Sequence, residues 1–252
     1  MNKYHDIIVV PDVHGRNFWQ KAIPEDVSNH LIVFLGDYFD PYSDEADVSW
    51  EQLCGRFNAI VSLKKSHPNN VVLLFGNHDL HYIWRNALPQ GGRYDFQHAD
   101  DIAGLLSDNW YCFSLAYECT MGDRQFLFTH AGVSRQWLEQ YPALFPNPDE
   151  VNAQLLNNLF EEGLLMENLG DISKHRGGVM DAGSPIWADV REMCHSYNWI
   201  GNYVQVFGHT QGHFVREYDG RAYCMDCRMV TKINSEGRVI ATFFEEDPGF
   251  LR

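Results

Sequence analysis

Aspartate, histidine and asparagine side chains gather at five points of the 252-residue sequence, each time with a glycine close by. The five segments are Asp12-Val13-His14-Gly15, Gly36-Asp37-Tyr38-Phe39-Asp40, Gly76-Asn77-His78-Asp79, Thr129-His130-Ala131-Gly132 and Gly208-His209-Thr210. One such residue is ordinary in a turn, whereas five groups in one chain are not. Carboxylates, imidazoles and amide oxygens together suit borderline divalent metals such as Mn, Fe and Zn. The residue types therefore predict a metal centre.

The spacing of these residues indicates how metals could be held. Asp12 and His14 are two residues apart, so on an extended strand end both side chains would point the same way and one metal could bind both. Asp37 has two carboxylate oxygens and is the natural bridge between two cations. We expect the glycines at 15, 36, 76 and 208 to bring the backbone close to the cluster without a Cβ clash.

Short apolar runs precede all five segments and predict buried strands at residues 7–10, 31–35, 71–75, 126–128 and 204–207. Continuous runs rich in β-branched and aromatic residues are typical of strands buried on both faces. Residues 50–66 carry apolar side chains at helical spacing. Alternating strands and helices predict a layered α/β fold, in which ligands gather beyond the carboxyl ends of the strands.

The length and the 45% hydrophobic content predict one domain covering residues 1–252. Residues 134–199 contain several prolines, a helical stretch at 151–162 and Gly177-Gly178, so we expect an inserted cap or helical excursion there. Beyond His209, short alternating segments separated by Asp219-Gly220 and Glu236-Gly237 predict β-hairpins.

The composition excludes several classes of protein. A net charge of −15 opposes binding to nucleic acid, which depends on Lys and Arg meeting phosphates. The sequence has no run of 18 apolar residues and no basic, apolar leader, so we expect a cytoplasmic protein without a membrane segment. Six scattered cysteines predict free thiols, and the lone pair Cys224 and Cys227 lacks the further ligands that a zinc ribbon needs.

In order and spacing, the five motifs resemble those of the calcineurin-like metallophosphoesterase superfamily: DxHG, GDxxD, GNH followed by Asp or Glu, a strand-end His and a late GH. The phosphoprotein phosphatase branch and its bacterial, Shewanella-like relatives are the most similar. That narrower resemblance rests on residues 129–133 and on Ser184-Pro185-Ile186-Trp187. It implies a layered αββα sandwich of two mixed β-sheets flanked by helices, with a helical insertion.

The resemblance also implies two divalent metal ions, with Mn²⁺ expected and Fe or Zn as alternatives. The first metal would bind Asp12, His14 and the bridging Asp37. The second metal would bind Asp37, Asn77, His130 and His209.

By the same resemblance, His78 is the general acid and Asp40 is the carboxylate that orients it and keeps it protonated. A hydroxide that bridges the metals would attack a phosphomonoester, which includes phosphoserine and phosphothreonine. The expected substrate is therefore a phosphorylated small molecule, a nucleotide or a phosphoprotein.

One departure from the branch concerns the substrate phosphate. Relatives carry Arg-Gly after the second motif, and that arginine grips the phosphate, but here Pro41-Tyr42 follow Asp40. Arginine is favoured for bidentate phosphate contacts, so we expect a substitute. The candidates are Arg16, Arg85, Arg135, Arg176 and Arg191, of which Arg176 and Arg191 are preferred because they flank the segments nearest to the last metal ligands.

Two other functions remain open at this stage. Residues 76–81 also resemble a segment of the bacterial diadenosine tetraphosphate hydrolases, which suggests a nucleotide or dinucleoside polyphosphate hydrolase. The chain could instead be a non-catalytic metal-binding scaffold. Such a scaffold would be expected to lack a ligand or the acid, whereas all of them are present here.

Overall fold

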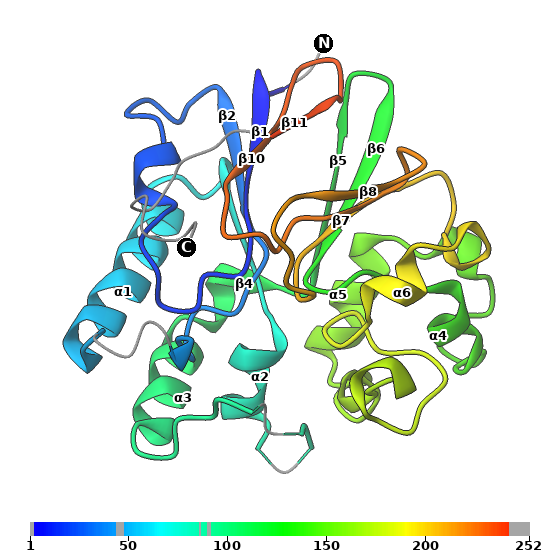
Figure 1. Ribbon diagram of the computed structural model, residues 1–252, viewed down its shortest axis with the longest axis horizontal. Helices are drawn as coiled ribbons and strands as arrows, with labels where there is room; N and C mark the ends of the chain where they lie inside the picture. Colours follow the sequence, from blue (N-terminus) through cyan, green and yellow to red (C-terminus); the bar gives the residue numbers. More distant parts are fainter. Residues whose placement is uncertain (1–2, 44–47, 86, 90–91, 242–252) are drawn as a thin grey trace.

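Two mixed β-sheets stand side by side in the middle of the molecule, with helices on their outer sides (Figure 1). The computed structural model describes residues 3–43, 48–85, 87–89 and 92–241. The first sheet has the strand order β11-β10-β1-β2-β3-β4, and the second has the order β5-β6-β7-β9-β8. This architecture is the layered α/β sandwich that the sequence predicts.

The strands of the first sheet are β1 (Asp6–Val10), β2 (His30–Phe34), β3 (Val71–Leu74), β4 (Phe113–Ser114), β10 (Thr231–Ile233) and β11 (Val239–Ala241). Those of the second sheet are β5 (Ala116–Met121), β6 (Arg124–Thr129), β7 (Val204–Phe207), β8 (Arg216–Tyr218) and β9 (Ala222–Cys224). Strands β1 to β4 run parallel, as do β6, β7 and β9. The carboxyl ends of the parallel strands therefore meet at one edge of each sheet.

Strands β1, β2 and β3 of the first sheet are buried on both faces because their side chains alternate between two cores. Ile7, Val9 and Leu31 pack toward Phe126 and Phe128 of the second sheet. The intervening residues of the same strands lie in the larger core, together with the helices outside the first sheet. This double burial explains why β1 and β2 read as continuous apolar runs.

Helix α1 (Trp50–Ser66) has the predicted bounds and covers the outer face of the first sheet with Leu53, Phe57 and Ile60. Its first turn is capped by Ser49 and Gln52, which bond to each other's backbone amides and so satisfy two otherwise unpaired donors. The other α-helices are α2 (Asn77–Ile83), α3 (Ala99–Asp108), α4 (Arg135–Glu139), α5 (Ala153–Glu161) and α6 (Val190–Met193).

Residues 134–199, where the sequence predicts an inserted cap or helical excursion, lie within the chain between β6 and β7. They hold α4, α5 and α6 and several short 3-10 turns, and these helices lie beside the second sheet (Figure 1). The predicted helix at 151–162 is shorter, because Asn152 caps the backbone amide of Leu155 and starts α5 at Ala153.

The predicted C-terminal hairpins are present, but they belong to different sheets. β8 and β9 pair antiparallel in the second sheet, and β10 and β11 pair antiparallel in the first. Asp219 and Gly220 both have positive φ, as a tight hairpin turn requires. The sequence did not predict β5, because its alternating burial at the sheet edge lacks a continuous apolar run.

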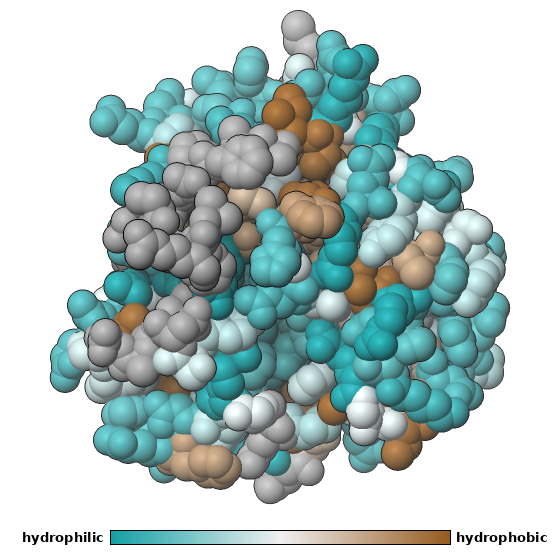
Figure 2. All heavy atoms as spheres, in the orientation of Figure 1, coloured by the Kyte–Doolittle hydropathy of each residue, from teal (hydrophilic) through white to brown (hydrophobic). Residues whose placement is uncertain are grey.

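The visible surface is mostly hydrophilic, and the exposed apolar residues form small, scattered patches on the face drawn in Figure 2. All six cysteines fall within the described residues and are free thiols, as predicted. None of the helices in the described part of the chain is long and apolar enough to cross a bilayer.

Candidate metal centre

The five polar segments converge where the carboxyl ends of the parallel strands meet. The predicted site residues follow β1, β2, β3, β6 and β7 in turn: Asp12 and His14, Asp37 and Asp40, Asn77 and His78, His130, and His209. Both sheets thus contribute, the first through three segments and the second through two. Asn77 and His78 form the first turn of α2.

One group of potential ligands consists of Asp12, His14 and Asp37, whose ligand atoms all lie within 4.8 Å of one another. Each of the three residues is only 1% exposed. His14 Nε2 lies 3.5 Å from Asp37 Oδ2. This is the group that the sequence assigned to the first metal.

A second group consists of Asp37, His130 and His209, again with ligand atoms within 4.8 Å of one another. His130 Nε2 lies 3.5 Å from Asp37 Oδ2, 3.0 Å from Asn77 Oδ1 and 3.1 Å from His209 Nδ1. Asp37 therefore belongs to both groups, as a bridging carboxylate would.

The hydrogen bonds of the histidines show that these groups are arranged for a cation. The Nδ1 atoms of His14 and His130 lie 3.0 Å and 2.8 Å from the carbonyl oxygens of Phe39 and Leu35, so each Nδ1 carries the proton and donates. In the neutral rings the Nε2 lone pairs then face other acceptors, namely Asp37 and, for His130, Asn77 as well. Hydrogen-bond acceptors that face one another in a buried site repel each other unless a positive charge lies between them. This set of potential ligand atoms therefore fits divalent metals.

Burial makes the acidic ligands costly to ionise on their own. It raises the pKa of Asp37 to about 8 and that of Asp12 to about 6, although neighbouring hydrogen bonds and positive charges oppose the shift. Burial also lowers the pKa of His14 and His209 well below the ordinary value, which keeps both rings neutral and able to bind a metal. Metal cations would favour the ionised carboxylates.

The backbone at the cluster is in an unusual conformation. Six non-glycine residues in the described ranges have positive φ, and four of them are His14, Asp37, Asp40 and His209. Such strain collects at functional sites. The expectation that Asp12 and His14 share one side of an extended strand end was wrong, because β1 stops at Val10 and His14 is left-handed.

Two glycines allow the backbone to pass directly against the carboxylates. A Cβ on Gly76 would lie 2.1 Å from Asp37 Oδ1, and one on Gly208 would lie 2.0 Å from Asp12 Oδ1. Gly15, in contrast, approaches Leu53 rather than the cluster.

Asp79 holds two of the ligand segments together. Its carboxylate accepts hydrogen bonds from the backbone amides of Asp37, Tyr38 and Gly76, at 2.8 to 2.9 Å. The side chain is fully buried. Asp79 thereby fixes the chain after β2 against the start of α2.

A second network surrounds His78, whose ring lies 5.2 Å from that of His14. His78 Nδ1 lies 2.6 Å from Asp40 Oδ2 and donates to it. His81 Nε2 lies 3.1 Å from the same oxygen, and the Tyr82 hydroxyl bonds to Asp40 Oδ1. Asp40 thus holds His78 by one nitrogen, while His81 and Tyr82 fix Asp40.

In this network, burial and hydrogen bonding shift the pKa values of Asp40 and His78 in opposite directions. Burial alone raises the pKa of Asp40, but hydrogen bonds from His78 and His81 outweigh it and leave that pKa below its usual value. Burial lowers the pKa of His78 to about 4, and the pair with Asp40 counteracts part of that shift. His78 gains a proton more readily when further negative charge approaches it.

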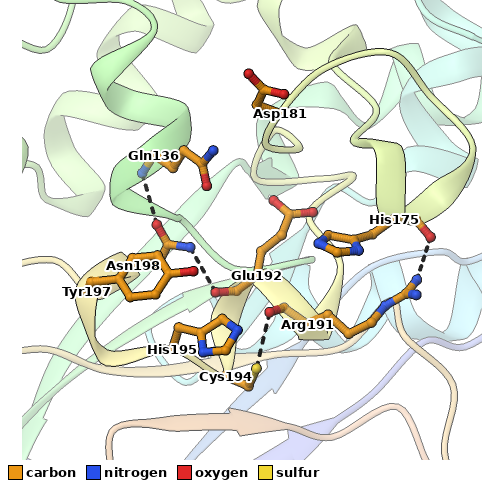
Figure 3. Close-up of a pocket in the computed structure, with 9 residues that line it drawn as sticks. All are labelled: Gln136, His175, Asp181, Arg191, Glu192, Cys194, His195, Tyr197 and Asn198. Atoms are coloured by element: carbon orange, nitrogen blue, oxygen red, sulfur yellow. Dashed lines mark hydrogen bonds between the residues drawn. The ribbon is translucent and has the colours of Figure 1, made fainter.

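The two favoured arginines lie in different places. Arg176 is largely buried and donates to the carbonyl of His209 at 2.8 Å, so the insertion does bring it to the cluster. Arg191 lines a separate hollow of about 320 Å³ (Figure 3), where its guanidinium bonds to the His175 carbonyl and to Asp189. The hydrogen bonds of the Arg191 guanidinium are therefore made to residues other than the predicted metal ligands.

The remaining candidate arginines have other partners. Arg16 donates to the carbonyls of Asp12 and Val13, Arg85 pairs with Asp100, and Arg135 pairs with Asp149. Arg16 therefore shapes the chain after β1.

Three further residues at the site were not among the site residues that the sequence predicts. Arg93 lies 3.1 Å from His14 Nε2, and the ring of Trp187 lies 5.5 Å from that of His209. Asp226 is buried, its oxygens accept no hydrogen bond from the described residues, and burial with the nearby Asp12 raises its pKa to about 7. Trp187 falls in a segment that resembles the family, but nothing local marks Arg93.

The comparisons with known proteins agree with this geometry. Residues 5–213 match the family model described as calcineurin-like phosphoesterase, so the chain belongs to the calcineurin-like phosphoesterase family. No curated protein sequence matches the chain.

Solved structures with the same fold include several phosphatases. A cold-active protein tyrosine phosphatase is 16% identical with a TM-score of 0.57, covering 96% of this chain and 80% of that one. Another, from a psychrophilic Shewanella species, is 16% identical with a TM-score of 0.55 and covers 96% and 82%. A protein serine/threonine phosphatase from Saccharomyces cerevisiae is 17% identical with a TM-score of 0.57 and covers 98% and 82%. At this level of identity the similarity concerns the fold.

Proposed function

We propose that this protein is a phosphatase that hydrolyses phosphomonoesters with two divalent metal ions. Asp12, His14 and Asp37 would hold the first ion, and Asp37, Asn77, His130 and His209 the second. The observation that carries the proposal is the shared carboxylate of Asp37, which belongs to both buried groups of potential ligands. When bound, two such metals supply an activated water and stabilise charge on the phosphoryl oxygens.

The protein's own groups would handle the leaving oxygen. The Nδ1–H group of His78 donates a hydrogen bond to Asp40. Nε2 is therefore the nitrogen that would protonate a leaving alkoxide. A phosphate ester is negatively charged, so its approach favours protonated His78 despite burial. His81 and Tyr82 restrain Asp40 and hence the orientation of the His78 ring.

The first experiment combines metal analysis with substrate profiling. The Mn²⁺-loaded protein is expected to hold two ions per chain and to cleave p-nitrophenyl phosphate. Phosphopeptides with phosphoserine, phosphothreonine and phosphotyrosine then divide the monoester substrates. Cleavage of diadenosine tetraphosphate alone would support the polyphosphate hydrolase instead, and fewer than two ions with no turnover would support a scaffold.

The acid is tested with His78→Ala. We expect both metals to remain bound while kcat on an alkyl phosphate falls by about 10² to 10⁴-fold, the usual contribution of a general acid. The loss should be smaller on p-nitrophenyl phosphate, whose leaving group needs little protonation. His213→Ala is the control, since His213 is exposed on the surface. Equal kcat for His78→Ala and wild type on the alkyl substrate would rule out this role.

A further inference from the structure

Tyr42 lies beside the predicted metal centre and follows Pro41, which stands where related phosphatases carry an arginine. Its ring packs edge to face against His14, with 4.8 Å between the ring centroids. Three guanidinium groups surround this ring: Arg93 at 3.8 Å, Arg228 at 4.9 Å and Arg16 at 5.3 Å from the centroid. They come from three separate segments of the chain, so the fold has assembled a cationic cluster over one aromatic side chain.

Of these arginines, Arg93 is placed best to reach a substrate. Its Nε donates to the carbonyl of Asp40 at 3.1 Å, while one terminal nitrogen lies 3.1 Å from His14 Nε2. Arg16 is 2% exposed and its hydrogen bonds hold the carbonyls of Asp12 and Val13. Arg93 is only half-buried, and no carboxylate of the described residues forms an ion pair with it.

The contact between Arg93 and His14 is the informative one. One terminal nitrogen of Arg93 lies 3.1 Å from Nε2 and 3.3 Å from Nδ1 of the same ring, so it packs against the imidazole and leaves the Nε2 lone pair available to a metal. The guanidinium of Arg93 therefore lies beside the predicted ligands of the first metal, and no carboxylate of the described residues forms an ion pair with it. An anion bound at the centre would supply the acceptor oxygens, and the planar guanidinium can bind two of them at once.

We propose that Arg93, held in place by the ring of Tyr42, binds the substrate phosphate and replaces the arginine missing after Asp40. This inference rests on the proposed phosphatase function and extends it by naming the residue that binds the dianionic group of a phosphomonoester. Arg176 reaches the cluster at the carbonyl of His209 instead, but it is also 3.7 Å from Asp189, which neutralises part of its charge.

The test measures the binding of inorganic phosphate to Mn²⁺-loaded protein by titration calorimetry. Arg93→Ala is expected to keep both metals and to weaken phosphate binding by about 10 to 100-fold, the range for a lost charge-assisted hydrogen bond. Arg93→Lys should recover only part of the affinity because it lacks the fork. Tyr42→Ala should weaken phosphate binding as well, whereas Tyr42→Phe keeps the ring and should not.

Arg85→Ala is the matched control, because Arg85 also follows α2 but pairs with Asp100. Phosphate affinity within twofold of wild type in Arg93→Ala, or loss of its metals, would overturn the assignment. A wild-type protein that binds two metals but neither binds phosphate nor hydrolyses monoesters would instead refute the proposed function itself.

Discussion

Asp37 is the residue that both groups of potential metal ligands share, and its environment is unfavourable for a charged carboxylate. It lies in both ligand groups, is 1% exposed and accepts a hydrogen bond at Oδ1 from the backbone amide of His78. Burial raises its pKa to about 8, so without metal the folded chain holds a proton that the unfolded chain releases near pH 4. In the metal-free protein, burial therefore keeps Asp37 protonated up to a higher pH than in the unfolded chain.

This shift predicts how the stability of the metal-free protein depends on pH. A carboxyl with a raised native pKa stabilises the fold below its unfolded pKa, and that stability is lost as the pH rises through the native value. Between about pH 7.5 and 8.5 histidines with pKa values near or below the ordinary value of about 6.5 are mostly neutral in both states. We expect Asp37 to lower the free energy of unfolding there by at most about 1.4 kcal/mol per pH unit.

The measurement is thermal or urea denaturation in a chelator at several pH values. Asp37→Asn removes the titrating group but keeps the size of the side chain, so its stability should change less over this interval. An identical pH dependence in wild type and Asp37→Asn would contradict the predicted pKa shift.

Among the structural elements, the chain after β2 and the start of α2 depend on each other through Asp79. Removing its carboxylate in Asp79→Ala would leave three buried backbone amides without their acceptor, at a cost of about 1–3 kcal/mol each. We expect a clear fall in the melting temperature and weaker Mn²⁺ binding, because Asp37 and Asn77 lose their relative position. Asp79→Asn retains one acceptor oxygen and should lose less of both; wild-type behaviour of Asp79→Ala would refute this role.

The elements also show which features a sequence reveals. Strands β1, β2 and β3 were predictable because burial on both faces demands unbroken apolar runs, and α1 was predictable from the helical spacing of its apolar residues. The backbone conformations of the turns that carry the predicted ligands were harder to predict from the sequence. The left-handed conformation of His14 depends on contacts with the chain after β2, such as the hydrogen bond from its amide to the Asp37 carbonyl, which no local pattern encodes.

At the scale of the whole molecule, the proposed metals would connect two sheets that otherwise meet mainly through apolar side chains. Asp12, His14 and Asp37 follow strands of the first sheet, while His130 and His209 follow strands of the second. The same convergence explains why Arg93 escaped prediction. It reaches the site from a segment 53 residues beyond Asp40, and only the packing of the whole chain brings the two together.

Metal removal should therefore destabilise the entire fold. A ligand at 100 times its Kd stabilises the native state by about 2.7 kcal/mol, which corresponds to about 5–10 °C in melting temperature for a domain of this size. We expect a rise of this order when Mn²⁺ is added to chelator-treated protein, as followed by differential scanning calorimetry. The rise should largely vanish in Asp37→Asn, and an equal melting temperature with and without Mn²⁺ would contradict the proposed link between the sheets.

The left-handed backbone at His14, Asp37, Asp40 and His209 has a consequence for how the site is dissected by mutagenesis. Histidine, aspartate and asparagine tolerate this conformation better than most residues, and glycine adopts it freely. Alanine at these four positions would remove a side chain and add backbone strain, so a loss of metal would have two causes. Glycine removes the ligand atom while it leaves the local geometry accessible. Paired alanine and glycine variants would thus separate the chemistry of each ligand from the shape of the chain that presents it.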